Sequence, residues 1–141
     1  MKKSMLALVL SASSLFAAHA LADDSVYQAF GQKQGLVSLM DDFVPRLIAD
    51  ARMKPFFEKA NQTNLKAQLA DQLCMVAGGP CQYKGVDMKN AHSSMDITKG
   101  NFNALVEVLQ LSMDAQKIPF AAQNKMLALL APMNRDIITV K

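Results

Sequence analysis

The sequence predicts one all-α domain behind an N-terminal leader. Apolar residues recur at three- and four-residue steps in long stretches, which is the spacing of one face of a helix. No stretch of β-branched residues alternates with polar residues over the length of a strand. With 141 residues, 51% of them hydrophobic, the chain is long enough for a single core, and it contains no repeat, linker or low-complexity segment.

The first 22 residues have the features of a secretory signal peptide. Lys2 and Lys3 precede an apolar run over residues 5–16, and small residues allow cleavage after Ala22. The run is shorter than the ~20 apolar residues that span a bilayer, which argues against an uncleaved anchor. We therefore expect residues 1–22 to be removed and residues 23–141 to form the domain. The mature protein is expected to be periplasmic or secreted, without membrane contact.

The mature chain is expected to be nearly neutral. Of the 15 Lys and Arg residues, two lie in the leader, so 13 remain against 12 acidic residues. No basic face survives removal of the leader, which argues against nucleic acid as a partner.

The first part of the domain is expected to contain three helical segments. A short helix covers residues 25–30 and stops at Gly31. A longer helix covers residues 33–49, where apolar residues form one face and Pro45 is expected to bend the axis. Residues 53–58 are too short for a regular helix and predict a single tight turn.

The middle of the chain combines one long helix with one brief helix. Asn61 or Thr63 can cap a helix that carries leucines at four-residue spacing. Gly78-Gly79-Pro80 stops this helix, and a loop follows. The brief helix then ends in His92, with Met88 one turn earlier on the same face.

Two more long helices are predicted in the C-terminal part. Thr98 can cap the first of them, which carries apolar residues between 102 and 113. Pro119 separates it from the last helix, in which Pro132 is expected to produce a bend.

Cys74 and Cys81 are the two cysteines of the chain. In an exported protein an oxidising compartment favours a disulfide between them, which would join the end of one helix to the next loop. A redox-active pair usually has C-x-x-C spacing, and covalent haem attachment needs C-x-x-C-H; neither is present. Two cysteines and one histidine are also too few for a closed zinc site without a carboxylate. We therefore interpret the pair as structural.

His92 is the one histidine outside the leader. A lone helical histidine is more often a core or surface residue than a ligand. Two features of the chain favour a ligand here: the apolar helices can wall a cavity, and a glycine-rich loop lets a short helix lean over a flat molecule. No second histidine or carboxylate cluster supports a catalytic zinc, whereas a single axial imidazole in an apolar pocket is what the iron of haem b requires.

These residues are part of a longer pattern that extends over nearly all of the mature chain, from Tyr27 to Ile138. Its motifs, in order, are Asp42-Phe43, Arg46-Leu47-Ile48-Ala49-Asp50, Pro55-Phe56-Phe57, Leu65-Lys66, Gly78-Gly79-Pro80, Tyr83-x-Gly85, Met88-Lys89, Ala91-His92, Ile97-Thr98, Phe102, Pro119 and Leu130-Ala131-Pro132. In their order and spacing the chain resembles the group 1, or N-type, truncated haemoglobins. The resemblance implies a truncated globin fold, a two-over-two helical sandwich around haem b.

The resemblance also implies a role for individual residues. His92 would be the proximal ligand of the haem iron, and Phe57 would pack on the haem edge. The distal side, where the gas binds, would be faced by Leu65, Leu69 and Leu73. The proximal side and the floor would be lined by Met88, Ile97, Phe102, Leu105 and Leu130. Lys66 and Tyr83 are candidate partners of the haem propionates, although each could equally be an exposed residue.

Two departures from the family concern the distal side. Many members carry a tyrosine at the position of Val44 and a glutamine at that of Leu69, and those groups hydrogen-bond the bound oxygen. Their loss removes on the order of 1 kcal/mol per hydrogen bond, so we expect weaker oxygen stabilisation and faster oxygen release. Gln68 or Gln72 could supply a substitute donor; the alternative is that both are solvated surface residues.

The sequence therefore predicts a protein that binds oxygen, and other diatomic gases such as nitric oxide, opposite His92. Nitric oxide dioxygenase activity is one alternative, which would need an electron donor that the sequence does not identify. Sensing or peroxidase-like chemistry is another, although the apolar distal residues offer no acid–base group. The third alternative is a haem-free helical interaction module. We expect a monomer.

Overall fold

The computed structural model describes residues 23–140, which contain eight α-helices and one 3-10 turn. The predicted signal peptide lies outside the described residues. The helices are α1 (Ser25–Ala29), α2 (Gln32–Ala49), α3 (Lys54–Phe57), α4 (Gln62–Val76), α5 (Met88–His92), α6 (Lys99–Ala115), α7 (Phe120–Leu130) and α8 (Asn134–Ile137). The 3-10 turn η1 (Ala131–Met133) lies between α7 and α8. The all-α prediction is confirmed.

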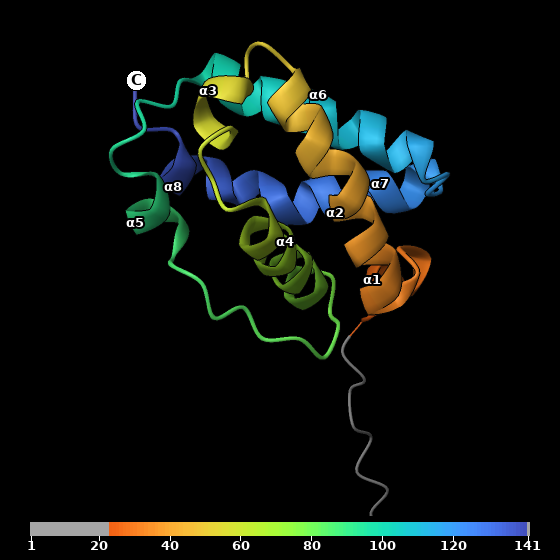
Figure 1. Ribbon diagram of the computed structural model, residues 1–141. Helices are drawn as coiled ribbons and strands as arrows, with labels where there is room; N and C mark the ends of the chain where they lie inside the picture. Colours follow the sequence, from red (N-terminus) through yellow and green to blue (C-terminus); the bar gives the residue numbers. More distant parts are fainter. Residues whose placement is uncertain (1–22, 141) are drawn as a thin grey trace, which may run out of the picture.

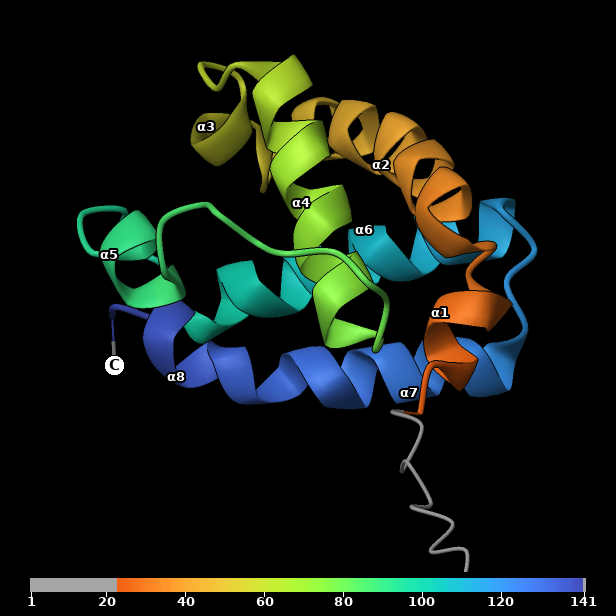
Figure 2. The ribbon, with the colours of Figure 1, turned by 90° about the horizontal axis from the view of Figure 1, so that it is seen from below.

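The four long helices form two crossed layers. Figures 1 and 2 show α2 and α4 in one layer and the nearly antiparallel helices α6 and α7 in the other. Helix α2 packs most extensively against α4 and α6, because its apolar stripe of Leu36, Leu39, Met40, Phe43 and Leu47 is buried. The core therefore lies between the layers. None of the helices between Asp23 and Val140 has the length and apolar character that a membrane crossing requires.

Local signals set most of the helix ends. The Asn61 side chain accepts a hydrogen bond from the backbone amide of Asn64 at 3.0 Å and caps α4. Thr98 and Asn101 form a reciprocal capping box at the start of α6. Pro45 lies inside α2, which continues to Ala49. Pro132 falls in η1, so the last predicted helix is divided into α7 and α8.

Helix α5 stands apart from the two layers. In both ribbon views it lies beside α8, and an irregular segment leads to it from the far end of α4. The segment that follows α5 in the sequence is hydrogen-bonded to the C-terminal segment. The amides of Thr139 and Val140 donate to the carbonyl of Ile97 at 2.9 and 3.0 Å. The amide of Ile97 donates in turn to Oγ1 of Thr139 at 2.8 Å.

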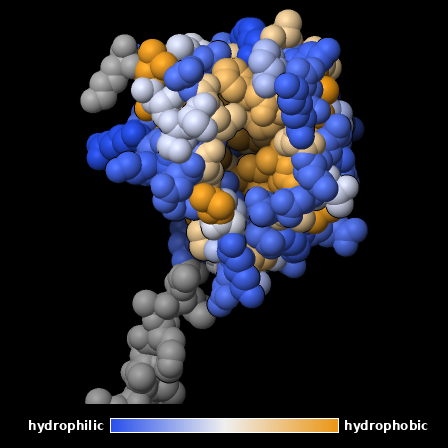
Figure 3. Space-filling view, turned by 60° about the vertical axis from the view of Figure 1, so that its left-hand side comes forward, coloured by the Kyte–Doolittle hydropathy of each residue, from blue (hydrophilic) through white to orange (hydrophobic). Residues whose placement is uncertain are grey.

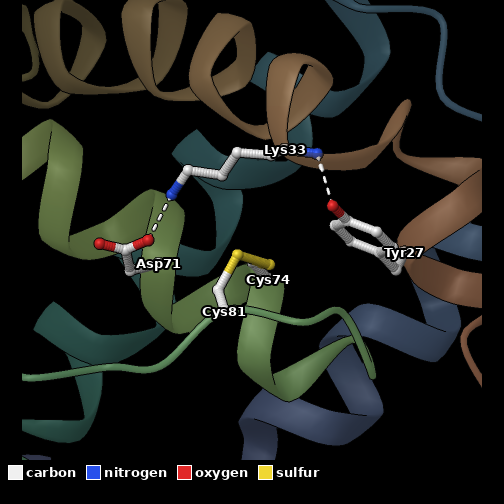
Figure 4. The surroundings of a disulfide bond; sticks show 5 residues. All are labelled: Tyr27, Lys33, Asp71, Cys74 and Cys81. Atoms are coloured by element: carbon white, nitrogen blue, oxygen red, sulfur yellow. Dashed lines mark hydrogen bonds and ion pairs between the residues drawn. A yellow bond between two sulfur atoms is a disulfide. The ribbon is translucent and has the colours of Figure 1, made fainter. Parts of the chain in front are cut away.

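A disulfide joins Cys74, near the end of α4, to Cys81 in the irregular segment (Figure 4). Its surroundings leave little room. A side chain at Gly79 would come within 2.7 Å of the Cys74 sulfur and of the Tyr27 ring. One at Gly78, whose φ is +83°, would come within 2.5 Å of the Asp23 carbonyl oxygen. The two glycines thus let the chain turn tightly against α1 and the disulfide.

Removing the disulfide should lower the free energy of unfolding. The bond closes a short loop, with a sequence separation of 7, for which the chain-entropy argument gives about 2–3 kcal/mol. We expect urea unfolding of Cys74→Ala/Cys81→Ala to show this loss. A reductant should lower wild-type stability to a similar extent and leave the double variant unchanged. Equal stability of oxidised and reduced wild type would contradict the expectation.

Candidate functional site

A cavity of about 530 Å³ is lined by residues of both layers, and by Met88, Ala91 and His92 of α5 and Ile137 of α8. Its volume is within the range of about 300–1,000 Å³ that is usual for ligand sites. The lining side chains are mainly aliphatic, aromatic and thioether groups, and in the described chain none of them is an Asp, Glu, Lys or Arg. The face shown in Figure 3 is hollowed where hydrophobic residues gather, with hydrophilic residues around the hollow. The cavity therefore suits a large apolar ligand.

The structure brings most of the expected pocket residues together around this cavity. Those that line it are Phe57, Leu65, Gln68, Leu69, Gln72, Leu73, Tyr83, Met88, His92, Phe102, Leu105 and Leu130. They come from α3, α4, α5, α6, α7 and the loop before α5. The predicted set is thus assembled from segments that are far apart in the sequence.

Three of the expected residues lie elsewhere. Val44 is fully buried, but its side chain does not line the cavity. Lys66 forms an ion pair across the α2–α4 contact, with its Nζ 2.9 Å from Oδ1 of Asp41. Ile97 lines a smaller adjoining cavity of about 90 Å³, which also borders His92.

The α2 wall of the cavity is formed by residues that the sequence reasoning assigned only to a buried helix face. Met40, Phe43 and Leu47 line it, at three- and four-residue steps along one side of α2. This spacing could have identified them, because residues at three- and four-residue steps share one side of a helix. Val44 directly follows Phe43 and therefore points in another direction from the helix axis.

His92 is the one imidazole on the cavity wall in the described chain. It is half-buried, and its Nδ1 lies 2.7 Å from the backbone carbonyl oxygen of Met88, one turn earlier in α5. A carbonyl oxygen only accepts hydrogen bonds, so Nδ1 carries the proton and donates. In the neutral imidazole, the lone pair is then on Nε2. A neutral imidazole held in this tautomer is a ready metal ligand.

Asp87 and Tyr83 support the helix that carries His92. The carboxylate of Asp87 caps α5 by accepting hydrogen bonds from the backbone amide and the side chain of Asn90, at 3.0 and 2.6 Å. These bonds lower the pKa of Asp87. The Tyr83 hydroxyl donates to the carbonyl of Val86 at 2.7 Å. Burial, together with the negative charge of Asp87, raises the pKa of Tyr83, so the hydroxyl remains a donor at neutral pH.

The two glutamines of α4 lie differently. Gln72 is buried, and its Nε2 lies 3.3 Å from the sulfur of Met88 and 3.7 Å from that of Met133. Gln68 is half-buried and lines the cavity one turn earlier. Both therefore line the cavity, and Gln72 is not a solvated surface residue.

Comparison with known proteins points to one family. The sequence model of the bacterial-like globins matches residues 25–139. A group 1 truncated haemoglobin of Tetrahymena pyriformis is 26% identical over 114 residues, covering 81% of this chain and 94% of that protein. One of Tetrahymena thermophila is 32% identical over 85 residues, covering 60% and 70%. One of Mycolicibacterium paratuberculosis is 28% identical over 115 residues, covering 82% and 85%.

Solved structures share the architecture. The Fe(III) form of the Tetrahymena pyriformis truncated haemoglobin superimposes with a TM-score of 0.77 at 26% identity, covering 80% of this chain and 97% of that one. The 2/2 haemoglobin of Synechococcus sp. PCC 7002 gives a TM-score of 0.74 at 19% identity, with the same coverage, and supports the fold alone.

Acid should loosen α5 through its cap. The pKa of Asp87 lies below the ordinary 3.8, so the stability contributed by the carboxylate is complete above about pH 3.8 and is lost as the pH falls through the lower folded value. Asparagine also caps helices but does not titrate. We expect hydrogen-exchange protection of the Asn90 and Ala91 amides to fall on acidification more in wild type than in Asp87→Asn. Identical pH profiles would show that the cap does not control α5.

Proposed function

The chain belongs to the bacterial-like globins, among the group 1 truncated haemoglobins, and from that premise we propose that it binds haem through His92 and a diatomic gas on the opposite side. The family and the two-over-two fold make it a haem globin. The proposal concerns what its own residues do with the cofactor and the ligand.

The cavity residues fit a haem. The porphyrin is flat and apolar over most of its area, and the lining of leucine, phenylalanine and methionine side chains offers it apolar contacts from both layers. The hollowed face leaves a route for charged propionates toward water. Tyr83 borders the cavity, but its hydroxyl proton is engaged by Val86, so it would bind a propionate only after a change of partner. Lys66 would likewise have to leave Asp41.

The single observation that carries the proposal is the hydrogen bond from His92 Nδ1 to the Met88 carbonyl. It leaves Nε2 as the nitrogen with an available lone pair on a residue that lines the cavity. When bound, haem would supply an iron able to bind both an imidazole and a small gas. His92 would hold that iron, and the apolar lining of the cavity would surround the gas.

The gas side is proposed to be largely apolar. Phe43, Leu65 and Leu69 line the cavity from α2 and α4, and none of them donates a hydrogen bond from its side chain. Gln68 is the polar side chain next to Leu69 on the cavity wall. Because the Gln72 amide contacts two thioethers, Gln68 is the better candidate for a substitute donor. Such a pocket favours reversible, rapidly released oxygen over strong oxygen retention.

We further propose that the protein works after export. The leader of residues 1–22 supports this, as does a disulfide that an oxidising compartment would preserve.

Replacing His92 should abolish axial ligation. We expect His92→Gly, purified with haem supplied, to lose the absorption spectrum of a histidine-ligated haem, because no other imidazole borders the cavity in the described chain. Free imidazole should restore that spectrum by occupying the vacated space. A wild type without a Soret band, or a variant with unchanged ligation, would refute the proposed role of His92.

Restoring a donor on the gas side should slow oxygen release. We expect Leu69→Gln to reduce the dissociation rate on the order of five-fold, since a neutral hydrogen bond contributes about 1 kcal/mol. Stopped-flow displacement of oxygen measures this rate. The matched control is Leu105→Gln, which adds the same amide on α6, where no contact with the gas is expected. Equal effects at both positions would show that Leu69 does not face the gas.

A further inference from the structure

Gln72 is a buried amide in an otherwise apolar part of the cavity. It is 7% exposed, and its Nε2 donates toward the sulfur atoms of Met88 and Met133, at 3.3 and 3.7 Å. Among residues 23–140 the partners of this N–H group are thioether sulfurs, and the Oε1 atom is not among the fully buried atoms that lack a partner. Its neighbours along the same helix, Leu69 and Leu73, are apolar.

Stability alone does not account for an amide at this position. A thioether sulfur is a weak hydrogen-bond acceptor, and burying an amide without good partners costs folding free energy. A leucine or methionine side chain of similar size would fill the same space without that cost. We therefore look for a functional role of the Gln72 amide in the residues that it contacts.

The contacts lead to His92. Met88, which receives the Gln72 amide on its sulfur, also provides the carbonyl oxygen that accepts the His92 Nδ1 proton at 2.7 Å. Gln72 belongs to α4, whereas Met88 begins α5. The Gln72 side chain thus connects α4 to Met88, the residue of α5 whose carbonyl orients the His92 imidazole.

A second connection lies nearby on α4. Cys74, two residues after Gln72, is bonded to Cys81. The segment between Cys81 and Met88 is consequently attached to α4 at both of its ends, covalently at the first and by the amide–thioether contact at the second. Met133 of η1 joins the second attachment.

We propose that Gln72 is a positioning residue for His92. By holding the Met88 side chain between α4 and η1, its amide keeps the start of α5 in one arrangement, and with it the direction of His92 Nε2. Gln72 therefore acts on the histidine side of the haem although it lies on the helix whose leucines face the gas. The inference rests on the proposed role of His92 as the iron ligand.

The test uses the haem-loaded protein and a signature of the ligand bond itself. Resonance Raman spectra of the reduced, gas-free protein report the iron–histidine stretching band. We expect Gln72→Leu and Met88→Leu each to shift or broaden this band and to speed haem transfer to an apoglobin acceptor severalfold. Gln72→Met, which has a similar length but no N–H donor, should behave like Gln72→Leu. The double variant Gln72→Leu/Met88→Leu should show no larger shift than either single variant, because both remove one contact.

Gln68→Leu is the matched control, one turn earlier on the same cavity wall, and should leave the iron–histidine band unchanged. An unchanged band in Gln72→Leu overturns the inference, even if haem is lost faster; faster oxygen release with that unchanged band would place Gln72 on the gas side. If Gln72→Leu does not fold, Gln72→Met and Met88→Leu decide the same question. A wild type without the band, or a band that survives in His92→Gly, refutes the proposed function and the inference together.

Discussion

The hydrogen bond from His92 Nδ1 to the Met88 carbonyl is the interaction on which the site depends. In the neutral imidazole it selects the tautomer with the lone pair on Nε2, and it does so within one helix of five residues. So short a helix is only marginally stable alone. It is maintained here by the Asp87 cap, by packing against α8 and by the attachment of the preceding loop to α4.

Helix α4 has two roles along its length. Its first half presents Leu65, Gln68 and Leu69 to the cavity, whereas its last turns contact the loop and the helix that carry His92 through Gln72 and Cys74. Helix α4 thereby contacts both the cavity and the segment that carries His92. A change in the position of α4 would therefore alter both the cavity wall formed by Leu65, Gln68 and Leu69 and the contacts of the segment that carries His92.

The cavity itself opposes folding of the chain without its cofactor. The side chains that line an empty space lack dispersion contacts on that side. A ligand that binds only the folded chain stabilises the folded state by mass action. The flexible thioethers of Met40, Met88 and Met133 line this space and can adapt to a ligand. Folding and haem binding are thus expected to be coupled, with the two-layer arrangement supplying the framework that remains.

The sequence by itself determined the long helices and several of their ends, because helical periodicity, caps and prolines are local properties that neighbouring residues specify. It also determined the family, since the order and spacing of many motifs exceed what single residues could indicate. The tertiary structure decided which of the expected side chains line the cavity. Val44 and Phe43 are adjacent in the chain, yet Phe43 lines the cavity and Val44 does not, because the rotation of α2 against α4 and α6 selects its face. Gln72 likewise received its partners from α5 and η1, 16 and 61 residues away, and no local pattern specifies a contact at that distance.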